Sequence, residues 1–147
     1  MLSRIKQYYH RVWAYIPALW HRFPSRKLKV IGVTGTKGKT TTVELMTYVF
    51  TAAGYKVVSS SGLQFRIGEK VVPNDFKMTM PGRGFLQNLL ARGVKEGCDM
   101  AILEPTSEGL IQSRHRYVDL DAAVFLGIHE EHLERHAGRL LDPGAQR

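Results

Sequence analysis

The chain has 147 residues, the length of one ordinary domain and too short for two. Hydrophobic residues make up 44% and charged residues 23% of the sequence, a composition that excludes collagen-like, low-complexity and disordered classes. The single cysteine, Cys98, excludes an internal disulfide and therefore a secreted fold that is stabilised by disulfides. We therefore expect a globular protein in a reducing, cytoplasmic location.

The formal net charge of +8 is concentrated at the start of the chain. Residues 1–43 hold nine Lys or Arg and no acidic residue, whereas residues 44–147 hold twelve basic and thirteen acidic residues. A nucleic-acid groove needs basic residues spread over a folded face, with aromatic side chains between them for base stacking. The nearly neutral body of the chain has neither feature, so we expect no nucleic-acid partner.

The first 27 residues form a basic segment with the pattern of an amphipathic helix. Its large apolar residues recur mostly three or four positions apart: Leu2, Ile5, Tyr9, Val12, Trp13, Ile16, Leu19, Trp20 and Phe23. No apolar run reaches the roughly 18 residues of a membrane span, and no signal-peptide pattern is present. The helix either packs on the following domain, which is the simpler interpretation, or places its aromatic and basic residues on an anionic membrane surface.

Strands and helices alternate from residue 28 onward. The predicted strands are residues 28–33, 57–59, 100–103 and 122–126, and the predicted helices are residues 41–53 and 85–97. Residues 63–67 and 71–72 alternate as a small hairpin does, and a short helix is expected after the strand at 100–103. This order predicts an α/β fold with a three-layer, mostly parallel sheet, preceded by the amphipathic N-terminal helix, with ligands at the carboxyl ends of the strands.

The segment Gly35-Thr36-Lys37-Gly38-Lys39-Thr40-Thr41 lies between a buried strand and the start of a helix. Its glycines permit a backbone nest whose N–H groups point at phosphate oxygens, and the helix amino end adds positive potential. In such a loop Lys39 reaches the β and γ phosphates, and Thr40 places its hydroxyl on Mg²⁺. The loop is a variant, because Val33 stands where the pattern GxxxxGK[ST] has its first glycine. A Gly/Thr turn with one exposed lysine is the alternative.

Three ordered segments resemble one family, the Mur ligases, which build the peptide stem of peptidoglycan. The run from Val30 to Thr42 looks like their ATP loop, which shares the departure at the first glycine. The run from Glu104 to Arg114 is similar to the motif after the middle strand in the tripeptide-synthetase type of the family. Residues 122–126, followed by residues 131–136, resemble the strand and metal motif further on.

The resemblance implies a division of the chain into three parts. Residues 28–138 would be a central ATP-binding domain, incomplete in this chain. Residues 1–27 would be a basic helical segment in place of the family's uridine-binding domain, and residues 139–147 an unmatched tail. The family's carbamoylated lysine and its amino-acid-binding C-terminal domain have no counterpart here, so we expect the chain alone to be inactive.

The resemblance also implies site residues. ATP would be held by the phosphate loop, with Lys39 as the catalytic contact: Gly35, Thr36, Lys37, Gly38, Lys39, Thr40 and Thr41. Thr40 would bind a first Mg²⁺, and Glu104 with His132 a second. The UDP-linked muramyl peptide would be held by Thr79, Thr106, Gln112 and Arg114.

Each of these roles has a simpler alternative. Glu104 could cap a helix or form an ion pair, His132 could be a solvated helix residue, and the four substrate-binding residues could be ordinary surface residues. A zinc site built from His129, His132 and His136 is disfavoured, because the first two histidines are three positions apart, not four, and no cysteine lies near them.

The family chemistry is ATP-dependent amide formation in peptidoglycan precursor synthesis. A substrate carboxylate attacks the γ-phosphate to give an acyl phosphate, and the amine of an amino acid then displaces phosphate. Positioning and charge neutralisation carry such a reaction, which explains why no Ser-His-Asp or Cys-His set is present. Three positions depart from the family pattern and concern the substrate contacts more than the ATP site: Met80, Glu108 and Gly127.

Two other functions are compatible with the sequence. The chain could be an ATP-binding module without ligase activity, tethered to a membrane by residues 1–27. It could also be another phosphate-loop enzyme, such as a small kinase or a folylpolyglutamate-type ligase, although the segment from Glu104 to Arg114 argues against both.

Overall fold

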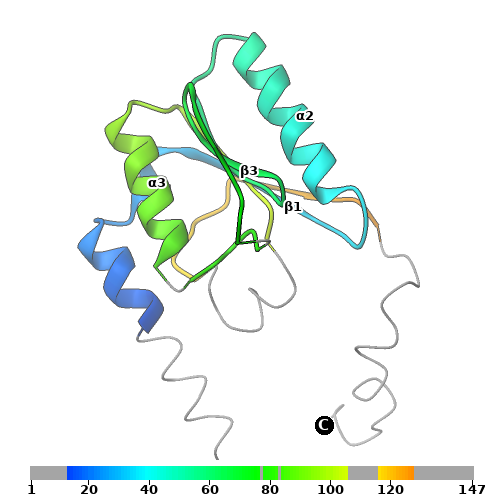
Figure 1. Ribbon diagram of the computed structural model, residues 1–147. Helices are drawn as coiled ribbons and strands as arrows, with labels where there is room; N and C mark the ends of the chain where they lie inside the picture. Colours follow the sequence, from blue (N-terminus) through cyan, green and yellow to red (C-terminus); the bar gives the residue numbers. More distant parts are fainter. Residues whose placement is uncertain (1–12, 77, 83, 106–115, 128–147) are drawn as a thin grey trace, which may run out of the picture.

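A computed structural model describes residues 13–76, 78–82, 84–105 and 116–127. A helix over residues 13–20 comes first (Figure 1). The elements that follow, in chain order, are η1 (Pro24–Lys27), β1 (Lys29–Thr34), α2 (Lys39–Ala52), β2 (Val57–Ser60), β3 (Gln64–Ile67), β4 (Lys70–Pro73), α3 (Phe85–Lys95), β5 (Met100–Leu103) and β6 (Ala122–Phe125).

The strands form one sheet in the order β4-β3-β2-β5-β1-β6. The pairs β2–β5, β5–β1 and β1–β6 are parallel, whereas the hairpin strands β3 and β4 pair antiparallel. Helix α2 covers one face of the sheet, and α3 with the helix over residues 13–20 lies on the other (Figure 1). This architecture confirms the predicted α/β fold with a mostly parallel, three-layer sheet.

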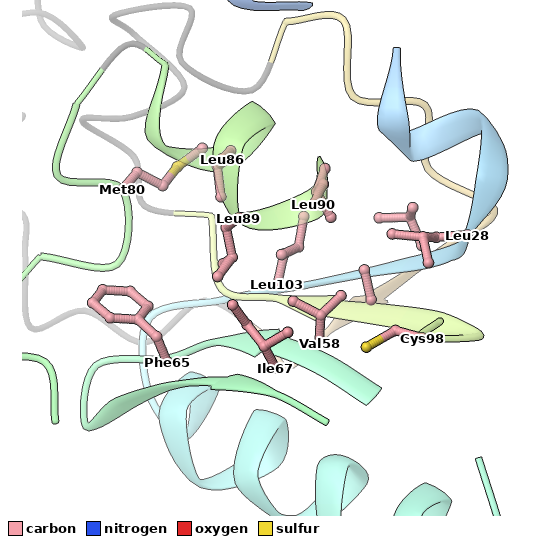
Figure 2. Packing of buried hydrophobic residues seen from close by; sticks show 12 residues of the cluster. Leu28, Val58, Phe65, Ile67, Met80, Leu86, Leu89, Leu90, Cys98 and Leu103 are labelled. Atoms are coloured by element: carbon pink, nitrogen blue, oxygen red, sulfur yellow. The ribbon is translucent and has the colours of Figure 1, made fainter. Parts of the chain in front are cut away.

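The two faces of the sheet are buried in separate clusters. On β5, Ala101 and Leu103 pack toward α3, while Met100 and Ile102 pack toward α2. This alternation is why the strand reads as a continuous apolar run, since a central parallel strand is covered on both sides. Figure 2 shows the α3 side, where leucines of the helix lie over apolar residues of the strands. Burial there raises the pKa of Cys98, which keeps its sulfur in the unreactive thiol form.

Glycines in the left-handed conformation determine where the elements begin and end. Gly54 (φ +92°) follows α2, and the N–H of Tyr55 donates to the carbonyl of Phe50 while the two rings pack edge to face. This is a Schellman termination. Gly97 (φ +73°) ends α3 in the same way, so this helix stops at Lys95, two residues before the expected end. At its other end α2 begins at Lys39, two residues earlier than expected, directly after Gly38.

The helix over residues 13–20 packs through its small residues. Ala14 and Ala18 are buried, and Pro17 lies against Gly84 at the start of α3. The large apolar side chains of the same helix are exposed: Trp13, Ile16, Leu19 and Trp20. The helix is therefore attached to the domain through Ala14, Pro17 and Ala18, with the ring of Tyr15 packed edge to face on Tyr117, while Leu19 and Trp20 are exposed.

No helix in the described ranges is both long enough and apolar enough to cross a bilayer. The short helix expected after β5 falls in residues 106–115, outside the described residues.

Asp121 fastens the start of β6 to β1. Its carboxylate accepts hydrogen bonds from the N–H of Val30 (2.8 Å) and from the ammonium of Lys29 (2.9 Å). These two donors, the backbone N–H first, hold the pKa of Asp121 below its ordinary value. A carboxylate with a lowered folded-state pKa stabilises the fold above its unfolded pKa, and this stabilisation is lost as pH falls through the folded pKa.

We predict that Asp121→Asn lowers the free energy of unfolding at neutral pH. The difference from the wild type should disappear in acid, below about pH 4, where the unfolded aspartate is protonated and the folded one follows. Urea denaturation followed by circular dichroism between pH 2.5 and pH 7 measures this. A difference that stays constant over that range would show that the charge of Asp121 contributes nothing.

Candidate functional site

The candidate site lies at the carboxyl edge of the parallel strands. Residues 35–38 connect β1 to α2, and Glu104 directly follows β5, the neighbour of β1. Because the two strands run parallel with Gly32 opposite Leu103, their carboxyl ends meet at one edge. The structure thus brings the phosphate loop and Glu104 together, as the sequence predicts.

The loop has glycine conformations that a phosphate-binding nest requires. Gly35 and Gly38 have φ values of +144° and +78°, and α2 begins at the next residue, so the free N–H groups of its first turn lie beside the loop. The loop also rests on the end of β6, where the N–H of Thr36 donates to the carbonyl of Gly127 (3.2 Å). A Cβ on Gly35 would stand 3.0 Å from the Cβ of Leu126, so glycine is required there for space as well as for conformation.

Lys39 folds back over this loop. Its ammonium nitrogen donates to the carbonyl oxygens of Gly35 (2.7 Å) and Thr36 (3.2 Å). The charge of Lys39 therefore lies over the loop, while Lys37 of the same loop is exposed. A phosphate bound by the loop's N–H groups would lie within reach of this ammonium group.

Thr40 and Glu104 meet beside the loop. The hydroxyl of Thr40 donates to Oε2 of Glu104 at 2.8 Å, and the same oxygen accepts from the N–H of Gly62 at 2.9 Å. Glu104 is only 6% exposed. Glu104 is thus a buried carboxylate that accepts from one hydroxyl and one backbone N–H.

The donor set fits Mg²⁺. Carboxylate and hydroxyl oxygens are the hard ligands that this ion prefers. When Thr40 donates its proton to Glu104, the lone pairs of its hydroxyl oxygen stay available to a cation. In the described part of the chain no group of three or more His, Cys, Asp or Glu side chains gathers as a metal cluster, so a cation here would also depend on phosphate, water or residues outside that part.

Among the predicted substrate-binding residues, Thr79 is the one that the structure describes. It is buried, and its backbone carbonyl accepts a hydrogen bond from the hydroxyl of Ser60 (2.6 Å), at the carboxyl end of β2. Its own hydroxyl has no hydrogen-bond partner within the described ranges. Met80 is also buried and belongs to the apolar cluster under α3 (Figure 2).

The remaining predicted residues lie outside the described residues: Thr106, Gln112, Arg114 and His132, together with His129 and His136 of the disfavoured zinc site. Their roles stay predictions.

Sequence reasoning missed the segment 61–64, which lies against both Thr40 and Glu104. Gly62 approaches so closely that a Cβ there would stand 2.8 Å from the hydroxyl oxygen of Thr40. A signal was present, because the polar run Ser59-Ser60-Ser61-Gly62 occupies the carboxyl end of the parallel strand β2 and the residues after it, at the edge where ligands bind.

Comparison with known proteins agrees with this geometry. A model of the Mur ligase middle domain matches residues 33–140, well over half of the chain. The chain belongs to the Mur ligase family. A UDP-N-acetylmuramyl-tripeptide synthetase of Treponema pallidum is 36% identical over 121 residues, which cover 81% of this chain and 22% of that protein.

Other Mur ligases agree in sequence and in structure. A UDP-N-acetylmuramoyl-L-alanyl-D-glutamate--2,6-diaminopimelate ligase of Parabacteroides distasonis is 38% identical over 117 residues, covering 80% of this chain and 24% of that ligase. The solved structure of a ligase with the same name superposes with a TM-score of 0.61 at 31% identity, covering 72% of this chain and 21% of the other. The chain thus spans less than a quarter of the length of these Mur ligases.

We predict that Gly62→Ala destabilises the domain by about 1–3 kcal/mol, because the added methyl group must push apart the Thr40–Glu104 pair in a packed site. Gly82→Ala is the matched control, since a Cβ at Gly82 meets nothing within 4 Å. Urea midpoints of the two variants measure the difference. Equal midpoints would contradict the close approach of segment 61–64 to this pair.

Proposed function

We propose that this chain is the ATP-binding part of a ligase that joins an amino acid to a UDP-linked muramyl peptide in peptidoglycan precursor synthesis. The observation that carries the proposal is the contact of Thr40 with the buried Glu104 beside a glycine-rich loop covered by Lys39. The names of the related Mur ligases supply the substrate class. We assign residues 28–138 to the central domain, residues 1–27 to a basic helical segment and residues 139–147 to a tail.

Each loop residue would act on the triphosphate in its own way. The N–H groups of residues 35–41 would donate to phosphate oxygens, and for Thr36 this means giving up its bond to the carbonyl of Gly127. Lys39 would exchange its two carbonyl partners for the β and γ phosphates. Thr40 would hold a first Mg²⁺, and Glu104 with His132 a second, and these ions would supply charge neutralisation on the phosphates when bound. This chain's part in the reaction is to hold and orient the nucleotide.

Thr79 would contribute to binding of the muramyl peptide, together with Thr106, Gln112 and Arg114. The support for Thr79 is its unpaired hydroxyl at the carboxyl edge, since a buried hydroxyl gains free energy when a ligand supplies its partner. Ligase activity itself would need the amino-acid-binding domain that the family carries. An ATP-binding module without ligase activity is the alternative, and both functions share the nucleotide site.

We predict that Lys39→Ala weakens binding of Mg-ATP to the full chain by about 10- to 100-fold, the loss expected for charge-assisted hydrogen bonds to phosphate. Isothermal titration calorimetry with a non-hydrolysable ATP analogue and Mg²⁺ measures this. Lys95→Ala, at an exposed position in the last turn of α3, is the matched control. Wild-type affinity in Lys39→Ala would refute the nucleotide site.

We also propose that the N-terminal segment contacts an anionic membrane surface. The helix over residues 13–20 turns its large apolar side chains to solvent, with Trp20 83% exposed and Leu19 53% exposed. Exposed Arg22 and Lys27 follow it, and residues 1–43 contain no acidic residue. Aromatic and basic side chains together are the combination that favours the interface of an anionic bilayer.

We predict that the chain sediments with vesicles containing phosphatidylglycerol and less with neutral phosphatidylcholine vesicles. The double substitution Leu19→Glu with Trp20→Glu should weaken partition at least about 10-fold, because it removes two apolar anchors and adds two negative charges. Tyr48→Glu, on the exposed face of α2, controls for a charge change elsewhere. Negligible sedimentation of the wild type would dismiss the membrane contact.

A further inference from the structure

Glu44 lies on α2 one helical turn after Thr40, and both of its carboxylate oxygens are engaged. Oε1 accepts from the hydroxyl of Ser61 at 2.5 Å, and Oε2 accepts from the side-chain amide of Gln64 at 2.6 Å. A carboxylate that binds two side chains of one short segment fixes that segment's position and orientation. Glu44 thereby fastens segment 61–64 to the helix that begins in the phosphate loop.

Segment 61–64 is also closed on itself. The hydroxyl of Ser61 accepts from the N–H groups of Leu63 (3.2 Å) and Gln64 (3.1 Å). Its single proton has two acceptors in reach, Oε1 of Glu44 at 2.5 Å and the carbonyl of Gln64 at 3.1 Å, and the shorter bond is the one to Glu44. The N–H of Ser61 donates to the carbonyl of Gln64 (3.0 Å). Asn74 adds a bond from its amide nitrogen to the carbonyl of Ser61 at 2.8 Å. The segment therefore behaves as one rigid turn.

Gly62, in the middle of this turn, connects it to the candidate metal site. Its N–H donates to the same oxygen of Glu104 that accepts from Thr40. The turn thus lies between two carboxylates, with Glu44 on one side and Glu104 on the other. A displacement of the turn would change the position of the Glu104 carboxylate relative to Thr40.

We propose that Glu44 is a positioning residue of the nucleotide-metal site: by fixing the Ser61–Gln64 turn it orients the Gly62 N–H and, through it, the carboxylate of Glu104. The inference rests on the proposed ATP and Mg²⁺ site, and it adds a residue outside the phosphate loop. We assign Glu44 to the turn and not to the metal, because both of its oxygens are engaged with side chains of the turn, Ser61 and Gln64. Loss of such outer contacts lowers metal affinity about 10- to 100-fold in other proteins.

The test compares Glu44→Ala with Glu44→Gln in the full chain. Affinity for a non-hydrolysable ATP analogue is measured by calorimetry in EDTA and again with saturating Mg²⁺, and the ratio of the two affinities is the readout. Glu44→Ala should reduce the wild-type ratio about 10-fold and leave the affinity in EDTA within about 2-fold. Glu44→Gln should keep the ratio within about 3-fold, because its amide oxygen accepts from Ser61 and the amide of Gln64 can rotate to match its nitrogen. Glu69→Ala, in the exposed turn between β3 and β4, is the matched control.

The outcomes separate positioning from the other roles. An unchanged ratio in Glu44→Ala, even with a lowered melting temperature, would overturn the inference and leave Glu44 a structural residue. An equal loss in Glu44→Gln would also overturn it, because the charge of Glu44 would then act on the metal directly. If Glu44→Ala does not fold, Gln64→Ala takes its place, because it removes one of the two hydrogen bonds between Glu44 and the turn. This variant should lower the affinity ratio about 3-fold, and an unchanged ratio in Gln64→Ala overturns the inference. A wild type that binds no nucleotide in either buffer refutes the proposed function, and the inference with it.

Discussion

The parallel pairing of β1 with β5 is the constraint on which the site depends. It joins two segments about 70 residues apart in sequence and sets Gly32 opposite Leu103. Beyond that pair, β5 leads directly to Glu104, and β1 continues through Val33 and Thr34 to the phosphate loop at residue 35. A shift of one residue in this register would turn Glu104 to the opposite face and separate it from Thr40, because side chains alternate along a strand. Packing opposes such a shift, because it would exchange side chains of different size between the two apolar clusters that cover β5.

The hydrogen bonds around Glu104 have a common physical reason. A buried carboxylate is costly unless donors surround it, and Thr40 and Gly62 supply two donors to a single oxygen. Those donors come from α2 and from the turn after β2, so three elements are fixed relative to one another by one side chain. The same reasoning applies to Glu44, whose two oxygens hold the other side of that turn.

Much of this arrangement could be read from the sequence. The apolar run at 100–103 predicts β5 with the bounds that the structure has, and the glycines around Lys39 predict the loop from their position between a strand and a helix. Glu104 follows from the rule that carboxyl ends of parallel strands share an edge. The role of segment 61–64 did not follow, because Ser61 and Gly62 meet partners 17 and 42 residues away and no local pattern encodes those contacts. The spacing of large apolar residues predicts the helix over residues 13–20, but it does not predict which face of that helix packs on the domain. The packed face contains small residues such as Ala18, which an apolar pattern of large side chains does not include but which let the helix lie close to its neighbours.

In the described part of the chain the sheet has two edge strands, β4 and β6, which differ in the residues that could oppose pairing with another strand. At one edge, β4 carries Lys70 and Pro73, a charged residue and one without an N–H group, and both discourage pairing with another strand. At the other edge, β6 consists of Ala122, Ala123, Val124 and Phe125, with neither charge nor proline. Pairing with a further strand is therefore disfavoured beside β4, whereas the residues of β6 contain nothing that opposes it. Any enlargement of this sheet, whether within a longer chain or between copies, would proceed from the side where the phosphate loop rests on the end of β6.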